Sequence, residues 1–352
     1  MMFELPLWLM VRSCGRVSSE AHRDRIETVP KPAGPPMVSL PSPGRTAPAE
    51  GYRGGSDMAA TELIYVPFNA AGIPTGVARM PAAIHAAGVE HRLASPVRSS
   101  WIPVTGMTTT RGASGLVNEH ALVEMVAAGA AAVRSAWQNR ATPIVVAGDC
   151  PVLLAPLIAA AADGGAGLVF LDGHEDAWDP HLTPTGEASD CEIGLALGLF
   201  SGPSALDASL PCLRPEHVAV LGPRDHAELA EAGQPSVHDR VATYRSCATL
   251  AASTASEIAE LVTAGAAAAD AGWWLHVDLD VLDTASLPAV DYPQPGGLTW
   301  TQLEEFAASC LSVSGCLGAS VVIYNPDLDD GRSAGRIADF IAFLADRLAS
   351  PG

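Results

Sequence analysis

The chain has 352 residues and a formal net charge of −19, with 20 Lys plus Arg against 39 Asp plus Glu. This acidic balance argues against nucleic acid or an anionic membrane as a partner, since both require basic surfaces. Lys31 is the single lysine, so the rest of the chain offers none for a Schiff base or a phosphate loop of the G-x-x-x-x-G-K type. Apolar residues make up 48% of the chain, which is enough for the core of one large domain.

The first 57 residues differ in composition from the remainder. They are rich in Pro, Gly and Ser, especially from residue 29 onward, and show neither strand nor helix periodicity there. Such a segment buries too little apolar surface to offset the entropy lost on ordering. We predict that residues 1–57 are disordered or are a spurious upstream extension, with Met58 as the natural start. N-terminal sequencing of the native protein tests this prediction.

Short apolar runs alternate with helical stretches over residues 58–352, which we interpret as a single α/β domain. Strands are predicted at Leu63–Pro67, Pro143–Ala147, Gly167–Leu171, His217–Leu221, Trp273–Asp278 and Ser320–Tyr324. Helices are predicted at Met80–Ala87, Asn118–Gln138, Val152–Ala162, Asp225–Ala232, Ala255–Ala268, Thr301–Ser312 and Ser333–Leu348. The strands are apolar on both faces, which is typical of a mostly parallel sheet covered by helices on each side.

The cysteines and the apolar runs indicate the cellular compartment. There are 7 cysteines, an odd number, and none forms a C-x-x-C pair. This pattern is typical of reduced thiols. No apolar run reaches the roughly 18 to 20 residues of a membrane-spanning helix. We therefore expect a cytoplasmic protein.

Polar clusters follow the ends of predicted strands, where ligands bind in parallel α/β sheets. Asp172, His174 and Asp176 alternate along the chain, and Asp278 and Asp280 are also two residues apart. An extended backbone places each set on one side. Ionised carboxylates so close together repel one another unless a divalent cation lies between them. The alternative is that each acid caps a following helix, but the repeated spacing favours a metal site, and oxygen-rich ligands with one imidazole suit manganese.

These motifs resemble the arginase/agmatinase family of ureohydrolases. That family carries G-G-D-H, D-A-H-x-D and S-x-D-x-D-x-x-D-P in this order. The chain reads Ala147-Gly-Asp-Cys150, Asp172-Gly-His-Glu-Asp176 and His276-Val-Asp-Leu-Asp-Val-Leu-Asp283. The resemblance covers about Thr61 to the end of the chain.

The resemblance implies a three-layer α/β/α fold and a site for two Mn²⁺ ions. Asp172 and Asp278 would bridge the ions. Residue 150 and Asp176 would complete one ion's ligands, and His174 with Asp280 the other's. A hydroxide between the ions would attack an amidine-like carbon of a small-molecule substrate, oriented by Asp176. The resemblance also implies a homo-oligomer, a trimer or hexamer.

The chain departs from the family at the first metal ligand. Cys150 stands where the family usually has His, and a thiolate ligand leaves Zn²⁺, Fe²⁺ or a single ion as alternatives to two Mn²⁺. Its alternative role is a small buried residue beside the site. Cysteine at this place resembles a minority branch of the family that includes a hydroxyarginine hydrolase.

Other departures affect catalysis and the substrate. The loop over residues 185–190 lacks the His that shuttles protons in arginases, so Glu187 or Asp190 is a candidate substitute, with a loop or helix-cap role as the alternative. His276 is a candidate catalytic residue or a buried group behind the ligands. Ile323 occupies the place of the Glu that pairs with the substrate guanidinium. This argues against arginine or agmatine and favours a neutral or differently held ureido, formimino or amide group.

We therefore expect a metal-dependent hydrolase that cleaves a non-peptide C–N bond in a small molecule. The alternative is a catalytically impaired family member that binds a metal or a small ligand. A deacetylase-like amidase fits the three motifs less well.

Overall fold

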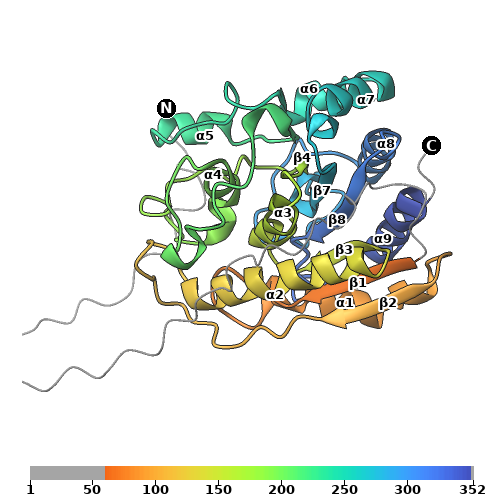
Figure 1. Cartoon of the computed structure of the whole chain (residues 1–352), viewed down its shortest axis with the longest axis horizontal. Coiled ribbons are helices and arrows are strands. Elements are labelled where there is room, and N and C mark those ends of the chain that lie inside the picture. The colour runs from red at the N-terminus through yellow and green to blue at the C-terminus, as the bar shows by residue number, and fades with distance from the viewer. Residues whose placement is uncertain (1–59, 350–352) are drawn as a thin grey trace, which may run out of the picture. The chain divides into compact units, whose positions relative to one another are not determined.

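Eight parallel strands form the central sheet of residues 60–349, the part of the chain described by the computed structural model (Figure 1). The strand order is β2-β1-β3-β8-β7-β4-β5-β6. The strands are β1 (Ala60–Val66), β2 (Val97–Trp101), β3 (Ala141–Ala147), β4 (Gly167–Leu171), β5 (Val218–Leu221), β6 (Thr243–Arg245), β7 (Trp273–Asp278) and β8 (Cys316–Val322). The prediction for residues 1–57, including the start at Met58, lies outside the described residues.

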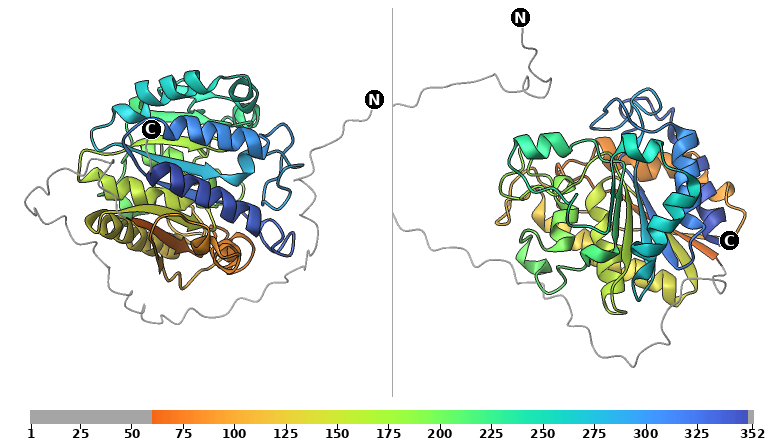
Figure 2. Two further views of the ribbon diagram at one scale, coloured as in Figure 1. Left: turned by 90° about the vertical axis from the view of Figure 1, so that its right-hand side faces the viewer. Right: turned by 90° about the horizontal axis from the view of Figure 1, so that it is seen from above.

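Helices cover both faces of the sheet. They are α1 (Met80–Ala86), α2 (Glu119–Gln138), α3 (Leu154–Ala161), α4 (Glu192–Leu197), α5 (His226–Glu231), α6 (Cys247–Ala251), α7 (Ala255–Ala264), α8 (Trp300–Leu311) and α9 (Ala334–Ala349). Helices α2 and α3 pack together on one face, whereas α1, α9, α8 and α7 follow one another along the other (Figure 2). The three-layer α/β/α architecture with a parallel sheet is confirmed. Within the described range, no helix combines the length and apolar character needed to cross a bilayer.

The edges of the sheet were not predicted from the sequence. Strand β2 reads VRSSW and is half exposed, and β6 has only 3 residues. Neither presents the apolar run that marks a buried strand. The short helices α4 and α6 were missed for a similar reason, because 6 and 5 residues are too few for a helical period to stand out.

Most predicted elements differ from the observed ones by a few residues at one or both ends, and two of these differences have a clear physical cause. The last strand was predicted at Ser320–Tyr324, but β8 ends at Val322 because Ile323 adopts a left-handed backbone conformation, with φ of 65°. That conformation is rare for a β-branched residue and breaks the extended strand. The helix predicted at Ala255–Ala268 ends at Ala264, since Gly265 leaves the helical conformation, and a separate 3-10 turn follows.

Three buried strands near the middle of the sheet carry the polar clusters. Strands β3, β4 and β7 are buried along their whole length, so burial of their apolar side chains sets their positions. Gly148 follows β3 where the chain passes close to the loop after β1. A Cβ atom there would lie 2.1 Å from the carbonyl oxygen of Phe68. Only glycine permits this approach, which brings the next two residues to the end of the sheet.

Candidate metal centre

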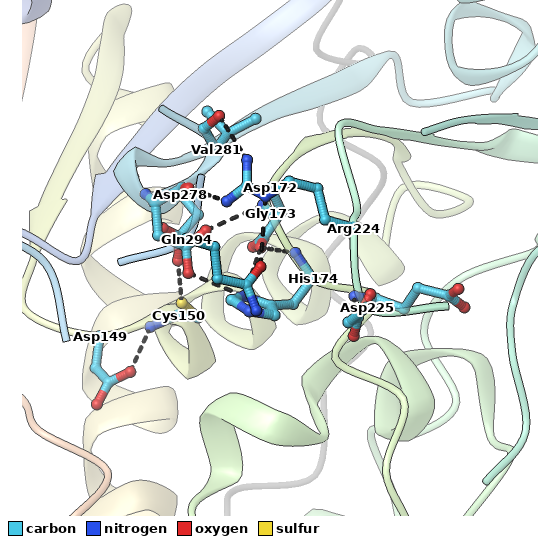
Figure 3. Close-up of polar contacts among 12 residues, drawn as sticks. Asp149, Cys150, Asp172, Gly173, His174, Arg224, Asp225, Asp278, Val281 and Gln294 are labelled. Atoms are coloured by element: carbon cyan, nitrogen blue, oxygen red, sulfur yellow. Dashed lines mark hydrogen bonds and ion pairs between the residues drawn. The ribbon is translucent and has the colours of Figure 1, made fainter. Parts of the chain in front are cut away.

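The three polar clusters meet at the carboxyl ends of β3, β4 and β7 (Figure 3). Cys150 opens the 3-10 turn Cys150–Leu153 after β3, and the side chain of Asp149 accepts a hydrogen bond from its N–H at 2.9 Å. Asp172 directly follows β4. Asp278 is the last residue of β7, and Asp280 lies in the turn after it. Strand β8 lies between β3 and β7, so the turn that carries Cys150 reaches across its end.

One part of the centre, the Cys150 half, consists of Cys150, Asp176, Glu192 and Asp278. The Cys150 thiol donates to Oδ2 of Asp278, with 2.7 Å between the sulfur and the oxygen. Ligand atoms of Cys150, Asp176 and Glu192, together with one of Asp172, all lie within 4.8 Å of one another. Every one of these side chains is buried. This is the spacing that a single cation needs.

The second part, the His174 half, consists of His174 and Asp280. Nδ1 of His174 lies 2.9 Å from Oδ2 of Asp280 and 3.9 Å from Oδ1 of Asp172. Ligand atoms of these three residues form another group within 4.8 Å. Asp172 therefore belongs to both groups, which is the arrangement expected of a bridging ligand.

The acids of the Cys150 half have pKa values well above those of free carboxyl groups. Burial, followed by the negative charges of neighbouring acids, raises the pKa of Asp176 and of Asp278 well above the ordinary value. Burial also raises the pKa of Glu192 and of the Cys150 thiol. Without a cation, burial and mutual repulsion favour the protonated forms of these groups.

The His174 half behaves differently. Burial opposes its charged form, but the Asp280 carboxylate raises the pKa of His174 to about 10. The pKa of Asp280 falls below its usual value despite burial, because His174 and then Arg224 favour its charge. This half carries its own counter-charge.

A divalent cation fits the residues that are present. Oδ2 of Asp172 is buried without a hydrogen-bond donor. Buried carboxylate oxygens normally have such a donor or coordinate a metal. Carboxylates, one imidazole and one thiol form a donor set for transition-metal ions. All six ligands predicted from the sequence lie in this cluster.

Glu192 belongs to the centre and was not predicted. It begins α4, 16 positions after Asp176, and its fully buried side chain joins the Cys150 group. From the sequence, an acid at the start of an apolar helix indicates a favourable interaction with the helix dipole. The signal that could have found it is its place as a lone acid in the otherwise apolar run Cys191-Glu-Ile-Gly-Leu-Ala196.

The candidate proton-transfer residues lie in the loop before α4. Burial, with the charges of Asp149, Asp190 and Asp291, raises the pKa of Glu187 to about 8. Asp190 accepts hydrogen bonds from the hydroxyls of Thr183 and Thr185, so its carboxylate braces the loop. Of the two candidates, Glu187 is the one whose carboxyl is not committed to such bonds.

Further acids lie beside the same loop and form the acidic rim, which we define as Asp149, Glu187 and Asp291. Burial and then Asp291 raise the pKa of Asp149 to about 7, and burial raises the pKa of Asp291. The charges of all three reach Tyr292, whose ring lies 6.2 Å from that of His174. The rim is therefore close to the metal centre.

Arg224 supports the His174 half from behind. Its guanidinium donates to the backbone carbonyls of Asp280 at 2.6 Å and Val281 at 3.0 Å (Figure 3). Gly173 makes room for it, since a Cβ atom there would lie 2.6 Å from both Arg224 Nη2 and Asp280 Oδ1. This explains glycine where the related motif has alanine.

His276 is fully buried beneath the centre and touches no solvent. Burial lowers the pKa of His276 to about 3, so its imidazole is neutral. A side chain sealed off in this way is poorly placed to exchange protons with a substrate, which disfavours the acid–base role considered for it.

This combination of a parallel three-layer fold and a double carboxylate site is characteristic of metal-dependent hydrolases. The model of the Arginase family matches residues 59–345, and the chain belongs to that family.

Several named proteins are similar to this chain in sequence or in structure. The chain is 28% identical over 209 residues to the N(omega)-hydroxy-L-arginine amidinohydrolase of Streptomyces lavendulae, covering 57% of this chain and 67% of that protein. It is 25% identical over 290 residues to the arginase of Bacillus caldovelox, covering 80% and 96%. The crystal structure of that arginase superposes with a TM-score of 0.70 at 24% identity, over 83% of this chain and 99% of the other. Proclavaminate amidino hydrolase from Streptomyces clavuligerus gives a TM-score of 0.62 at 16% identity, over 84% and 94%.

Proposed function

We propose that this protein is a metal-dependent hydrolase that cleaves a guanidino-type C–N bond in a small molecule. The observation that carries the proposal is the convergence of ligand-type side chains from three strand ends into two groups that share Asp172. Membership of the arginase family and the amidinohydrolase names of the relatives support catalysis over a role limited to binding. A homo-oligomer and a cytoplasmic location, both expected from the sequence, remain part of the proposal.

The two groups would hold two divalent cations, with Mn²⁺ as the first candidate. Asp172 and Asp278 would bridge them, and the Cys150 half and the His174 half would each supply the remaining ligands. When bound, such ions lower the pKa of water and stabilise negative charge that develops at a trigonal carbon.

The chain's own residues would manage the protons. Asp176 lies in the Cys150 half and can accept a hydrogen bond from the attacking water, which orients it toward the substrate carbon. Glu187, with a pKa raised to about 8, holds a proton near neutral pH. It can release that proton to the leaving nitrogen as the C–N bond breaks.

The acidic rim bears on the substrate class. Ile323 offers no charge for a guanidinium, which argued against arginine and agmatine. Yet the charges of Asp149, Glu187 and Asp291 all act on Tyr292, whose ring lies 6.2 Å from that of His174, and carboxylates are the usual partners of cationic nitrogen groups. We propose that Asp291, the exposed member of the rim, rather than residue 323, receives the charged or polar end of the substrate. A guanidino compound is therefore compatible with this site.

The test combines metal analysis with a turnover screen over arginine, agmatine, Nω-hydroxyarginine and ureido and formimino compounds. We expect up to two transition-metal ions per chain and turnover of at least one guanidino compound. Asp278→Ala should remove both, because Asp278 would bridge the ions. Asp270→Ala is the matched control. Asp270 is exposed and lies just before the start of β7, whereas Asp278 is at the end of that strand. A wild-type protein without metal or turnover, or full turnover in Asp278→Ala, would contradict the proposal.

A further inference from the structure

The buried ring of His276 has a hydrogen-bond partner at one of its two nitrogens but not at the other. Its ring stacks on Phe170 with centroids 5.1 Å apart and planes 9° from parallel. Nδ1 lies 2.7 Å from the hydroxyl oxygen of Ser320, which also accepts a hydrogen bond from the Trp274 indole at 3.0 Å. The other ring nitrogen, Nε2, is buried and has no partner. A histidine that served packing alone would leave this nitrogen desolvated without compensation.

The sheet register directs this ring toward the metal centre. His276 on β7 pairs with Phe170 on β4 and with Ser320 on β8, so the three side chains lie side by side on one face. Asp278 follows two residues later on that face, and Asp172 follows Phe170 in the same way. His276 therefore lies one level below the carboxylates. One of its ring nitrogens, the thiol of Cys150 and an oxygen of Asp172 lie within 4.8 Å of one another.

We propose that Nε2 of His276 is a ligand of the cation in the Cys150 half. The proposal rests on the proposed function, since it assigns a further ligand to the same centre. Ser320 orients the ring: if Nδ1 carries the proton and donates it to the Ser320 hydroxyl, the lone pair of Nε2 is free for a metal. Metal-bound histidines are commonly held in this manner by a hydrogen bond at the other nitrogen.

The position of the imidazole compensates for the loss at position 150. The related motifs place His at that position and Ser at position 276, whereas this chain has Cys150 and His276. The chain thus keeps an imidazole in this half and adds a thiol. The set of thiolate, imidazole and carboxylate is softer than the set of Asp172, His174 and Asp280. We infer that the Cys150 half prefers Zn²⁺ or Fe²⁺ over Mn²⁺.

The first experiment measures metal binding to the purified full-length chain after removal of metal. Zn²⁺ and Co²⁺ are titrated against a chelating indicator into wild type, His276→Phe and Ser320→Ala. Phenylalanine preserves the stacking on Phe170 but has no nitrogen. We expect one of two sites to weaken by ~100-fold or more in His276→Phe, and by ~10-fold in Ser320→Ala, the range typical of losing a hydrogen bond to a ligand. His276→Phe should keep the metal-free unfolding midpoint of wild type.

A paired exchange separates ligation from packing. Cys150→His/His276→Ser restores the residues of the related motifs. If His276 is a ligand, the double variant should recover affinity that His276→Ser alone loses, and its Co²⁺ form should lack the sulfur-to-metal absorption. A purely structural histidine predicts no such recovery.

A crystal structure of the zinc-loaded wild type tests the idea without any variant. Nε2 should lie about 2.0–2.1 Å from a zinc ion identified by anomalous scattering. Two sites of unchanged affinity in His276→Phe, or a zinc ion without Nε2 in its coordination, would overturn the inference while the proposed function stands. A wild type that binds no metal would overturn both.

Discussion

The Cys150 half and the His174 half of the centre differ in how their charge is balanced. In the His174 half, an imidazole lies 2.9 Å from Asp280, and Arg224 lies behind it. In the Cys150 half, a thiol and three carboxyl groups are buried together, and within residues 60–349 none of them forms an ion pair with a basic side chain. The His174 half therefore balances its charge within the folded protein. The Cys150 half needs protons or a bound cation to offset the repulsion among its acids.

The largest expected effect sets the two halves directly against each other. Asp280→Asn and Asp176→Asn should both reduce turnover to background, because each removes a proposed ligand. In the metal-free protein at pH 8 their effects on stability should be opposite. Asp280→Asn should lower the free energy of unfolding by ~1–3 kcal/mol, since it leaves His174 without its partner. Asp176→Asn should raise it, since repulsion within the cluster is relieved.

Asparagine suits this pair of variants. It tolerates the left-handed backbone that Asp176 adopts, with φ of 45°. The measurement is denaturant unfolding in the presence of a chelator. Equal destabilisation by both substitutions would break the comparison, because it would mean that the two carboxylates experience the same electrostatic surroundings.

Glu187→Gln separates proton transfer from metal binding. Loss of a positioned acid or base reduces the catalytic rate by ~10²–10⁴-fold, while both halves should retain their metal. Because the raised pKa of Glu187 is about 8, the wild-type rate should decline as pH rises through that region. The variant should lose this decline. Rates over pH 6 to 10, with metal content measured at each end, give the result; an unchanged wild-type profile in the variant excludes Glu187 as the proton donor.

Glu192→Gln tests whether the acid found only in the structure belongs to the Cys150 half. We expect metal affinity at one site to fall by ~10- to 100-fold, and the metal-free protein to become more stable, since a buried carboxyl with a raised pKa is removed. Glu260→Gln on the exposed face of α7 is the control. Unchanged affinity would show that Glu192 lies beside the metal without binding it.

A further expected effect is a pH dependence of stability in the metal-free protein. The buried acids have raised pKa values, about 7 for Asp149 and about 8 for Glu187, so the native state binds more protons than the unfolded state. Stability is then full below pH ~4 for these groups and falls as pH rises toward 8, by up to ~1.4 kcal/mol per pH unit for each titrating group. Added Mn²⁺ or Zn²⁺ should remove this decline. Unfolding curves at pH 5 and 8, with and without metal, provide the check.

The ligands predicted from the sequence share one property. Asp172, His174 and Asp176 lie within one short segment of the chain, as do Asp278 and Asp280, so their period-2 spacing was visible as a pattern. The carboxyl ends of parallel strands meet at one edge, which allowed the two turns and Cys150 to be placed together. For these residues, local spacing and the expected sheet were sufficient.

Glu192 and His276 are residues of the site that no local sequence pattern identified as candidate ligands. Glu192 is a lone acid in an apolar run and His276 is one apolar-flanked position of a strand, and each pattern has an ordinary structural explanation. Their contacts with Cys150 come from other elements of the fold. No spacing along the chain encodes the distance between the start of α4 and the turn after β3.

The sequence by itself determined that this is a parallel α/β protein with a cluster of carboxylates at the ends of its strands, because strand–helix alternation and period-2 acids are local features. Tertiary structure alone decided which strand lies beside which, how β8 separates β3 from β7, and which half of the site carries its own counter-charge. The physical reason is that burial and electrostatic interaction depend on distances in space, and these follow from the packing of the whole core rather than from neighbouring residues.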